Sequence, residues 1–133
     1  MIINAKNQSD SQIIPMPNIS LNRKTKYKIA VRRIFFVLED QNQDLPAHDL
    51  IIVSSNLVDR SAENPEQAIV HIDFARKSKY VSYCPHSITY QQLRLYEIEG
   101  ASFALSLLDG RPLSFKKFFI QIEILRDDSY GWF

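Results

Sequence analysis

The sequence predicts an all-β protein, a single-domain antiparallel β-sandwich, from three observations. Apolar and polar residues alternate with period two along several segments, as expected for strands with one buried face. The alternation is clearest in 103–107 and 118–124, on either side of the turn 108–112. The Asp109-Gly110 pair in that turn favours a hairpin, because glycine accepts a positive φ. No long helical pattern interrupts these segments, which favours two packed sheets.

Residues 1–24 differ in composition from the rest of the chain. They are rich in Asn, Gln, Ser and Pro, and Pro15 and Pro17 interrupt their short apolar stretch. Since proline removes a backbone donor, this stretch supplies at most an edge strand. We expect an extended N-terminal arm that packs either along its own domain or onto a neighbour. Its apolar residues, which we assign as assembly contacts, are Ile13, Ile14, Met16 and Ile19.

The next strand, 27–38, contains a change of phase. Its apolar positions follow one alternation up to Val31 and the other from Ile34, and the change falls at Arg32-Arg33. A β-bulge with one extra residue there would keep both apolar sets on the core side. The alternative is a strand that is covered on both faces. The two sets are Tyr27, Ile29 and Val31, then Ile34, Phe36 and Leu38.

The remaining elements follow from similar patterns and from turn residues. Seven strands are expected, and an eighth if the N-terminal arm also forms one. The sandwich spans 25–126, and Asp127–Phe133 forms a C-terminal tail. The other expected strands are 50–53, 68–74, 80–84 and 93–98; 41–48 and 59–66 are loops, and 87–90 is a connector with room for one helical turn.

Composition restricts the partners and the compartment. The net charge of +1 provides no overall attraction to nucleic acid or to an anionic membrane. The single cysteine, Cys84, excludes an intramolecular disulfide, so a reducing compartment and a buried, unreactive thiol are expected. Residues 1–6 lack the basic and apolar regions of a secretory signal, and no apolar run approaches the ~20 residues of a membrane span. We expect a soluble product that is made in the cytoplasm.

No pattern of chemistry-bearing residues indicates catalysis. His48, His71 and His86 are too widely spaced for a cupin-type metal site, so structural or surface roles are expected. A triad of a serine with His71 and Asp73 lacks the glycines of a nucleophile elbow. With three glycines in the chain, a phosphate-binding loop is also excluded. The sequence therefore predicts no enzyme, no metal and no cofactor.

Two charged or aromatic segments suggest contacts with partners. Lys26, Lys28 and Arg32 share one face of a strand, which could meet phosphates, acidic lipid headgroups or an acidic protein surface. A solvated face, or pairing with Asp127-Asp128, is the preferred interpretation. The tail either folds back onto the sandwich or inserts into a neighbouring subunit. Its aromatic residues, assigned as further assembly contacts, are Tyr130, Trp132 and Phe133.

Several segments between Leu50 and Arg126 resemble one family, the small single jelly-roll capsid proteins. The segments are Leu50–Val58, Pro85, Leu93, Ser106–Phe115 and Ile120–Leu125. The family comprises penton or minor capsid proteins of tailless double-jelly-roll viruses, including Polinton-like and adintovirus-like elements and membrane-containing phages.

The resemblance implies an eight-stranded jelly roll and a structural role in the virion. The chain would form a homopentamer at the fivefold vertices of an icosahedral shell. The arm and the tail would clamp the neighbouring major capsid protein. No catalytic residue is carried over from the family. Many eukaryotic members carry an additional domain, and its absence from this sequence favours a vertex base to which a separate spike protein attaches.

Two other functions compete with assembly. In a ligand- or carbohydrate-binding sandwich, aromatic side chains would form a platform, and the candidates are Tyr80, Tyr83, Tyr90 and Tyr96. A cupin-type enzyme is disfavoured by the histidine spacing. Strand count does not separate a jelly roll from an immunoglobulin-like order. The jelly roll is therefore preferred through the resemblance alone.

Overall fold

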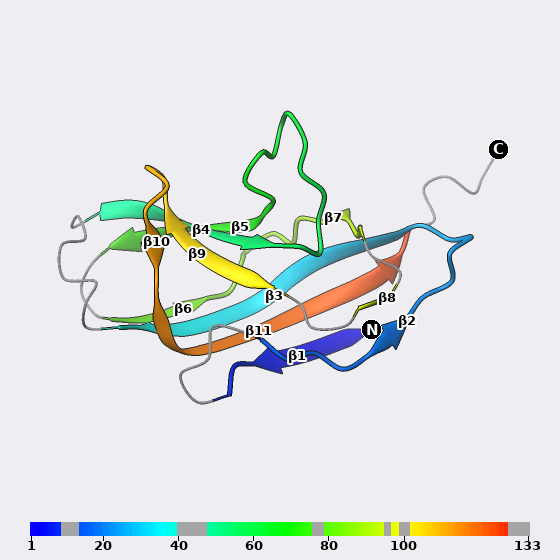
Figure 1. Ribbon diagram of the computed structural model, residues 1–133, viewed down its shortest axis with the longest axis horizontal. Helices are drawn as coiled ribbons and strands as arrows, with labels where there is room; N and C mark the ends of the chain where they lie inside the picture. Colours follow the sequence, from blue (N-terminus) through cyan, green and yellow to red (C-terminus); the bar gives the residue numbers. More distant parts are fainter. Residues whose placement is uncertain (9–13, 40–47, 76–78, 95–96, 99–101, 128–133) are drawn as a thin grey trace.

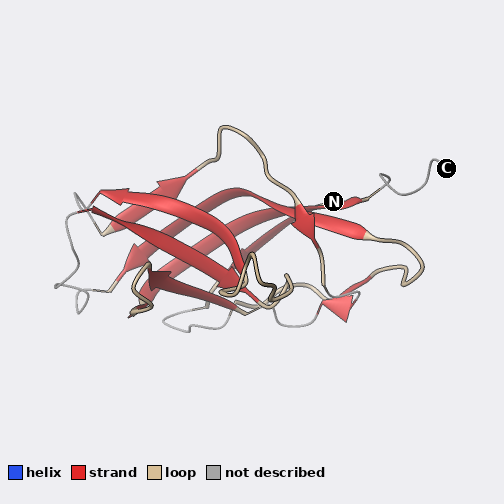
Figure 2. Cartoon of the chain, turned by 90° about the horizontal axis from the view of Figure 1, so that it is seen from above, coloured by secondary structure: helices blue, strands red, loops and turns tan. Residues whose placement is uncertain are grey.

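The computed structural model describes residues 1–8, 14–39, 48–75, 79–94, 97–98 and 102–127. These residues contain strands and loops but no helix (Figure 2). The strands, in chain order, are β1 (Ile2–Lys6), β2 (Ile19–Ser20), β3 (Tyr27–Leu38), β4 (His48–Ser55), β5 (Ala68–Ala75), β6 (Tyr80–Tyr83), β7 (Gln91–Gln92), β8 (Glu97–Ile98), β9 (Phe103–Leu107), β10 (Pro112–Leu113) and β11 (Phe115–Arg126).

Two antiparallel sheets pack face to face, which confirms the predicted β-sandwich. The five-stranded sheet has the order β1-β11-β3-β6, with β7 also paired to β3, and the four-stranded sheet has the order β10-β9-β4-β5. In Figure 1 the four-stranded sheet lies above the five-stranded one. A third, two-stranded sheet joins β2 to β8.

The strand pairings do not confirm a jelly roll. That fold pairs the first strand with the last and continues inward strand by strand. When the strands are counted from β3, the outer two pairs are present, β3 with β11 and β4 with β9. However, β5 pairs with its sequence neighbour β4, and β6 pairs with β3. The jelly-roll order therefore stays a prediction.

The bulge in β3 is confirmed. Gln121 of β11 pairs with Arg33, but the next residue, Ile122, pairs with Val31, so Arg32 is the extra residue. Both apolar sets consequently reach the core. Ile29 and Val31 before the bulge, and Ile34, Phe36 and Leu38 after it, are all buried in one cluster.

The turn at Gly110 differs from the expected hairpin in its partner strand. Gly110 has a φ of 92°, and its N–H donates to the carbonyl of Leu107 at 2.9 Å. The strand paired across this turn is the short β10, whereas the long β11 lies in the opposite sheet. The chain crosses between the sheets at Ser114, directly before β11.

The expected strand 93–98 is also different. In its described part only Glu97–Ile98 (β8) is strand, and the short β7 precedes it, because the chain leaves β3 at this point. The N–H of Leu93 still donates to the carbonyl of Tyr27, while that of Arg94 donates to the carbonyl of Leu57, which follows β4. The single helical turn considered for 87–90 is not formed.

The described parts of the first 24 residues, 1–8 and 14–24, pack along their own domain, which is one of the two placements expected for the arm. β1 is an edge strand on β11, and it buries Ile3 and Ala5 in the core. Ile14 and Met16 are buried in the same cluster, at 0% and 8% exposure. Because these apolar side chains complete the core of their own chain, the segment belongs to the sandwich.

Candidate interaction surface

The outer face of the five-stranded sheet, which points away from the four-stranded sheet, carries the candidate site. Inward positions on β11 are Phe118, Ile120, Ile122 and Ile124, all buried. The intervening side chains therefore point outward, and cross-strand pairing arranges them in rows. Three of these rows of cross-strand partners are Lys117-Val37-Tyr80, Lys6-Phe119-Phe35-Ser82 and Ile2-Glu123-Ala30.

An aromatic groove lies at the end of this face where β11 begins. Phe119 and Phe35 are direct cross-strand partners, and both are half-buried. They contribute to a groove of about 810 Å³. Lysines accompany them: Lys6 and Lys117 are exposed, and Lys116 is half-buried. The complete lining is Lys6, Asn7, Gln8, Phe35, Lys116, Lys117, Phe118 and Phe119.

Asn7 fastens the end of β1 beside this groove. Its Oδ1 accepts from the N–H of Phe118 at 2.8 Å, and its Nδ2 donates to the carbonyl of Lys116 at 3.1 Å. The N–H of Asn7 also donates to the carbonyl of Phe118 at 3.1 Å. This asparagine thus continues the pairing of β1 with β11 beyond Lys6 and fixes one wall of the groove.

An ion cluster occupies the opposite end of the same face. Glu123 accepts from Arg32 Nη1 at 2.6 Å and from the Tyr90 hydroxyl at 3.1 Å. Lys28 Nζ lies 4.9 Å from the centre of the Tyr90 ring. The hydrogen bond from Arg32 holds the pKa of Glu123 below its usual range, and the bond from Tyr90 lowers it further. Burial raises the pKa of Tyr90, and its bond to Glu123 adds to this shift.

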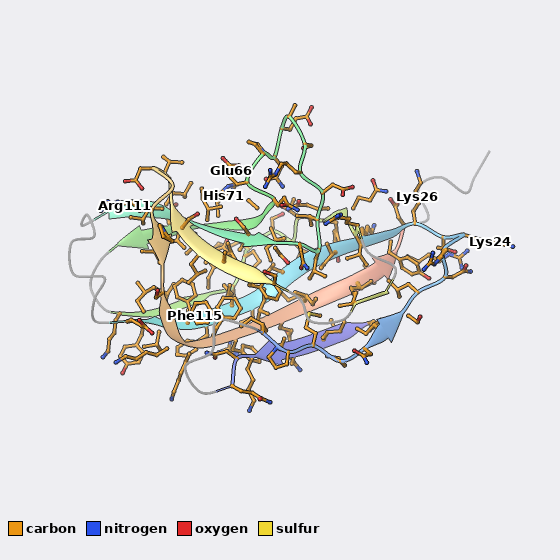
Figure 3. All side chains as sticks on the ribbon, in the orientation of Figure 1. Lys24, Lys26, Glu66, His71, Arg111 and Phe115 are labelled. Atoms are coloured by element: carbon orange, nitrogen blue, oxygen red, sulfur yellow. The ribbon has the colours of Figure 1, made fainter. Side chains whose placement is uncertain are left out.

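The predicted basic face is therefore only partly assembled. Lys28 and Arg32 lie together, as expected, but Glu123 and Tyr90 engage them within the chain. Lys26 precedes β3 and lies at the end of the molecule remote from Phe115 (Figure 3). The structure favours the interpretation of a face paired with acidic residues, since Arg32 forms an ion pair with Glu123, and Asp128 lies outside the described residues.

The predicted assembly contacts fall into three groups. Ile14 and Met16 are buried in the core, so they are not available to a neighbour in this conformation. Ile19 is half-buried in β2 and packs against the core. Ile13, Tyr130, Trp132 and Phe133 lie outside the described residues.

The remaining candidate residues do not converge. His71 and His86 are exposed, and the side chain of His48 lies outside the described part. Within the described residues, no three His, Cys, Asp or Glu side chains are grouped to hold a metal ion. Likewise, no helical segment there has the length and apolar character of a membrane span.

Cys84 is exposed, which corrects the expectation of a buried thiol. The reason is the phase of β6. Val81 is buried and Tyr83 packs against the core, so the inward positions are odd-numbered. Cys84 follows the strand in the outward phase, directly before Pro85.

The tyrosines of the alternative ligand platform are also dispersed. Tyr80 is exposed opposite Val37, and Tyr83 packs against the core. Tyr90 lies over Lys28, at the far end of β3. Tyr96 is outside the described residues. The three described tyrosines therefore do not share a surface on which a sugar ring could stack.

A smaller cavity of about 260 Å³ lies beside β5 and the connection from β6 to β7. Its lining includes Val31, His71 and Tyr83. Gln91 also lines it, and its Nε2 donates to the carbonyl of Ala68 at 3.1 Å. This side-chain bond joins the two sheets on that side of the sandwich, which gives the region a structural role.

Sequence reasoning did not identify the aromatic groove, although one signal for it was present. Phe35 and Phe119 occupy the polar phase of their strands, where alternation assigns outward-facing side chains. Aromatic residues at outward positions on two strands indicate a surface patch once those strands are known to pair. Comparison with known proteins adds no assignment: no family model, curated protein or solved structure matches this chain.

Proposed function

We propose that this chain is a structural protein of a viral capsid, a vertex (penton) or minor capsid subunit that acts by assembly. The observation that carries the proposal is the aromatic groove of Phe35 and Phe119 on an outward-facing sheet. Aromatic residues, phenylalanine among them, are enriched in protein–protein interfaces. The phenylalanine rings of this groove offer apolar contact area to a partner, and its lysines offer positive charge.

Exposed apolar side chains at both edges of the same sheet support assembly. Met1 and Ile2 on the β1 side are 58% and 51% exposed, and Tyr80 on β6 is 59% exposed. An edge strand also presents unpaired backbone groups, which a neighbouring chain can use. Exposed apolar side chains therefore lie at both edges of the five-stranded sheet, where a neighbouring chain could contact them.

The capsid assignment itself rests on the resemblance described above. A β-sandwich is compatible with that family, and the proposed partners are other copies in a pentamer, the adjacent major capsid protein and a separate spike. The proposed location is the virion. Contact with genome or membrane is not part of the proposal, since Lys28 and Arg32 of the predicted basic face are engaged with Tyr90 and Glu123.

The proposal is tested by the solution mass of the purified chain across a concentration range. We expect an oligomer that dissociates on dilution. Ile2→Lys and Tyr80→Lys should shift dissociation to higher concentration, because each places a charge at an apolar contact. Leu108→Lys is the matched control, since Leu108 is 68% exposed in the β9–β10 turn, away from this sheet. A chain that remains monomeric throughout contradicts self-assembly.

A further inference from the structure

We propose that the aromatic groove binds the segment Asp127–Phe133 of a second copy of this chain. The inference rests on the proposed assembly function and assigns one of its contacts. The occupant is a segment of the same sequence. The contact is directional, because the groove lies where β11 begins and Asp127, the described start of the segment, follows the other end of β11.

The chemistry of the groove selects a segment that is both aromatic and acidic. Phe35 and Phe119 provide an apolar floor for aromatic rings. Lys6 and Lys117 place positive charge at its rim, and none of the described residues that line it is acidic. Lysine ammonium groups attract carboxylates and also the faces of aromatic rings.

The segment Asp127–Phe133 has this combination of side chains. It contains three aromatic residues, Tyr130, Trp132 and Phe133, within a few positions of Asp127 and Asp128. Trp132 is the single tryptophan of the chain. Tryptophan and tyrosine are enriched among residues that dominate binding at protein interfaces.

Distance along the sheet argues against the groove of the same chain as the acceptor. β11 runs the length of its sheet (Figure 1), from the groove at Lys117 to Arg126. The two positions are nine residue steps apart along the strand, about 30 Å at roughly 3.3 Å per residue. The backbone of Asp127 is fixed at the far end, where its N–H donates to the carbonyl of Lys26.

From that point the segment would have to reverse direction. Its six residues beyond Asp127 reach at most about 22 Å when fully extended. Even fully extended and reversed, the backbone of the segment therefore ends short of Lys117 and of the row that contains Lys6, Phe119 and Phe35 in its own chain. A second copy supplies the groove instead.

Such a contact is heterologous, since two different surfaces meet. Repetition of a heterologous contact produces a closed ring when the rotation between copies closes. The inference thus gives a directional contact of the kind that a ring of subunits requires. It leaves the number of copies in the ring to experiment.

The emission of Trp132 in the full chain provides the test, because no other tryptophan contributes. We expect a blue-shifted emission, protected from acrylamide, at concentrations where light scattering detects the oligomer. Dilution to the monomer should return the emission to that of exposed tryptophan. Both measurements are made on the same samples.

Variants locate the contact. Lys117→Glu should shift the emission transition to about tenfold higher concentration, since it reverses a rim charge. Adding Asp128→Lys to Lys117→Glu should restore it. Lys24→Glu is the matched control, because Lys24 is exposed at the far end of the sheet, and it should leave the transition unchanged (Figure 3).

The outcomes separate this inference from the proposed function. An oligomer in which Trp132 stays exposed overturns the inference and leaves assembly intact. Emission that is blue-shifted at every concentration overturns it in favour of a tail folded onto its own chain. A monomer at all concentrations, with exposed Trp132, contradicts both.

Discussion

Along β3 and β11 the inner face of the five-stranded sheet is apolar, whereas its outer face is divided. One end of the outer face holds the aromatic groove, the other holds the ion cluster around Glu123. The same strands, β3 and β11, build both faces, so neighbours such as Phe118 and Phe119 have different roles. Burial of Phe118 stabilises the chain, while the placement of Phe119 makes a surface available to a partner.

The largest effect is expected from changing the phase of β3. Deleting Phe35 shifts one part of β3 by one residue relative to β11. If the part after the deletion shifts, Phe36 and Leu38 turn outward. If the part before it shifts and the bulge is lost, Arg33 points into the core. Each result costs several kcal/mol, about the whole stability of a small domain. We expect no cooperative thermal transition and poor dispersion of amide resonances.

Deletion of Arg32 is the matched control for that experiment. It removes the extra residue, so Ile29, Val31 and Ile34 alternate without a bulge. The variant should fold, with a loss limited to the contacts of Arg32 with Glu123. If both deletions abolish folding, the bulge is not what aligns the two apolar sets.

Truncation of the two adjacent phenylalanines compares the faces directly. Phe118 is 1% exposed and contacts Phe36, Phe103 and Phe115, with ring centres 5.0–6.3 Å away. Phe118→Ala should lower the free energy of unfolding by about 3–5 kcal/mol. Phe119→Ala should cost about 1 kcal/mol, because its ring is half-buried on the outer face. Urea denaturation measures both, and equal losses would contradict the division of roles.

A smaller effect is expected at the end of β1. Asn7→Ala removes two hydrogen bonds to the backbone of β11 and leaves the N–H of Phe118 without its side-chain acceptor. The expected loss is about 1–2 kcal/mol in the free energy of unfolding. Asn4→Ala is the control, since Asn4 makes an exposed bond to Gln121, and it should change stability by less than about 0.5 kcal/mol. If Asn4→Ala costs as much, Asn7 has no special role.

The smallest effect concerns pH. The pKa of Glu123 is lowered in the folded chain, so the carboxylate contributes stability above its unfolded pKa of about 4.3. That contribution is lost as pH falls through the lower folded pKa. The wild type should therefore melt above Glu123→Gln at neutral pH, and the difference should vanish in acid. Glu63→Gln, at an exposed loop position, is the control for unspecific charge effects. A difference that persists in acid contradicts the assignment.

Alternation along the strands was sufficient to predict most of the fold. The bounds of β3 and β9 and the bulge at Arg32 followed from the phase of apolar residues, because burial of one face imposes that phase. The partner of each strand did not follow, since alternation identifies a buried face but not the sheet to which a strand belongs. This is why β11 was expected beside β9 across the Gly110 turn.

The first 24 residues show the same limit. Prolines and polar residues favoured an arm, yet Ile3, Ala5 and Ile14 complete the core. The burial of Ile3 and Ala5 depends on the pairing of β1 with β11, which no local pattern reveals. The aromatic groove could not be predicted from the sequence for a related reason. Phe35 and Phe119 lie far apart in the sequence and become neighbours only through the pairing of β3 with β11.

The most direct test of the assembly account is the native mass of the full chain, measured by sedimentation velocity from low to high concentration. The account predicts a reversible oligomer, with the pentamer as the species that the capsid proposal favours. Tyr80→Lys should weaken it and Leu108→Lys should not. A single monomeric species over the whole range would contradict the account.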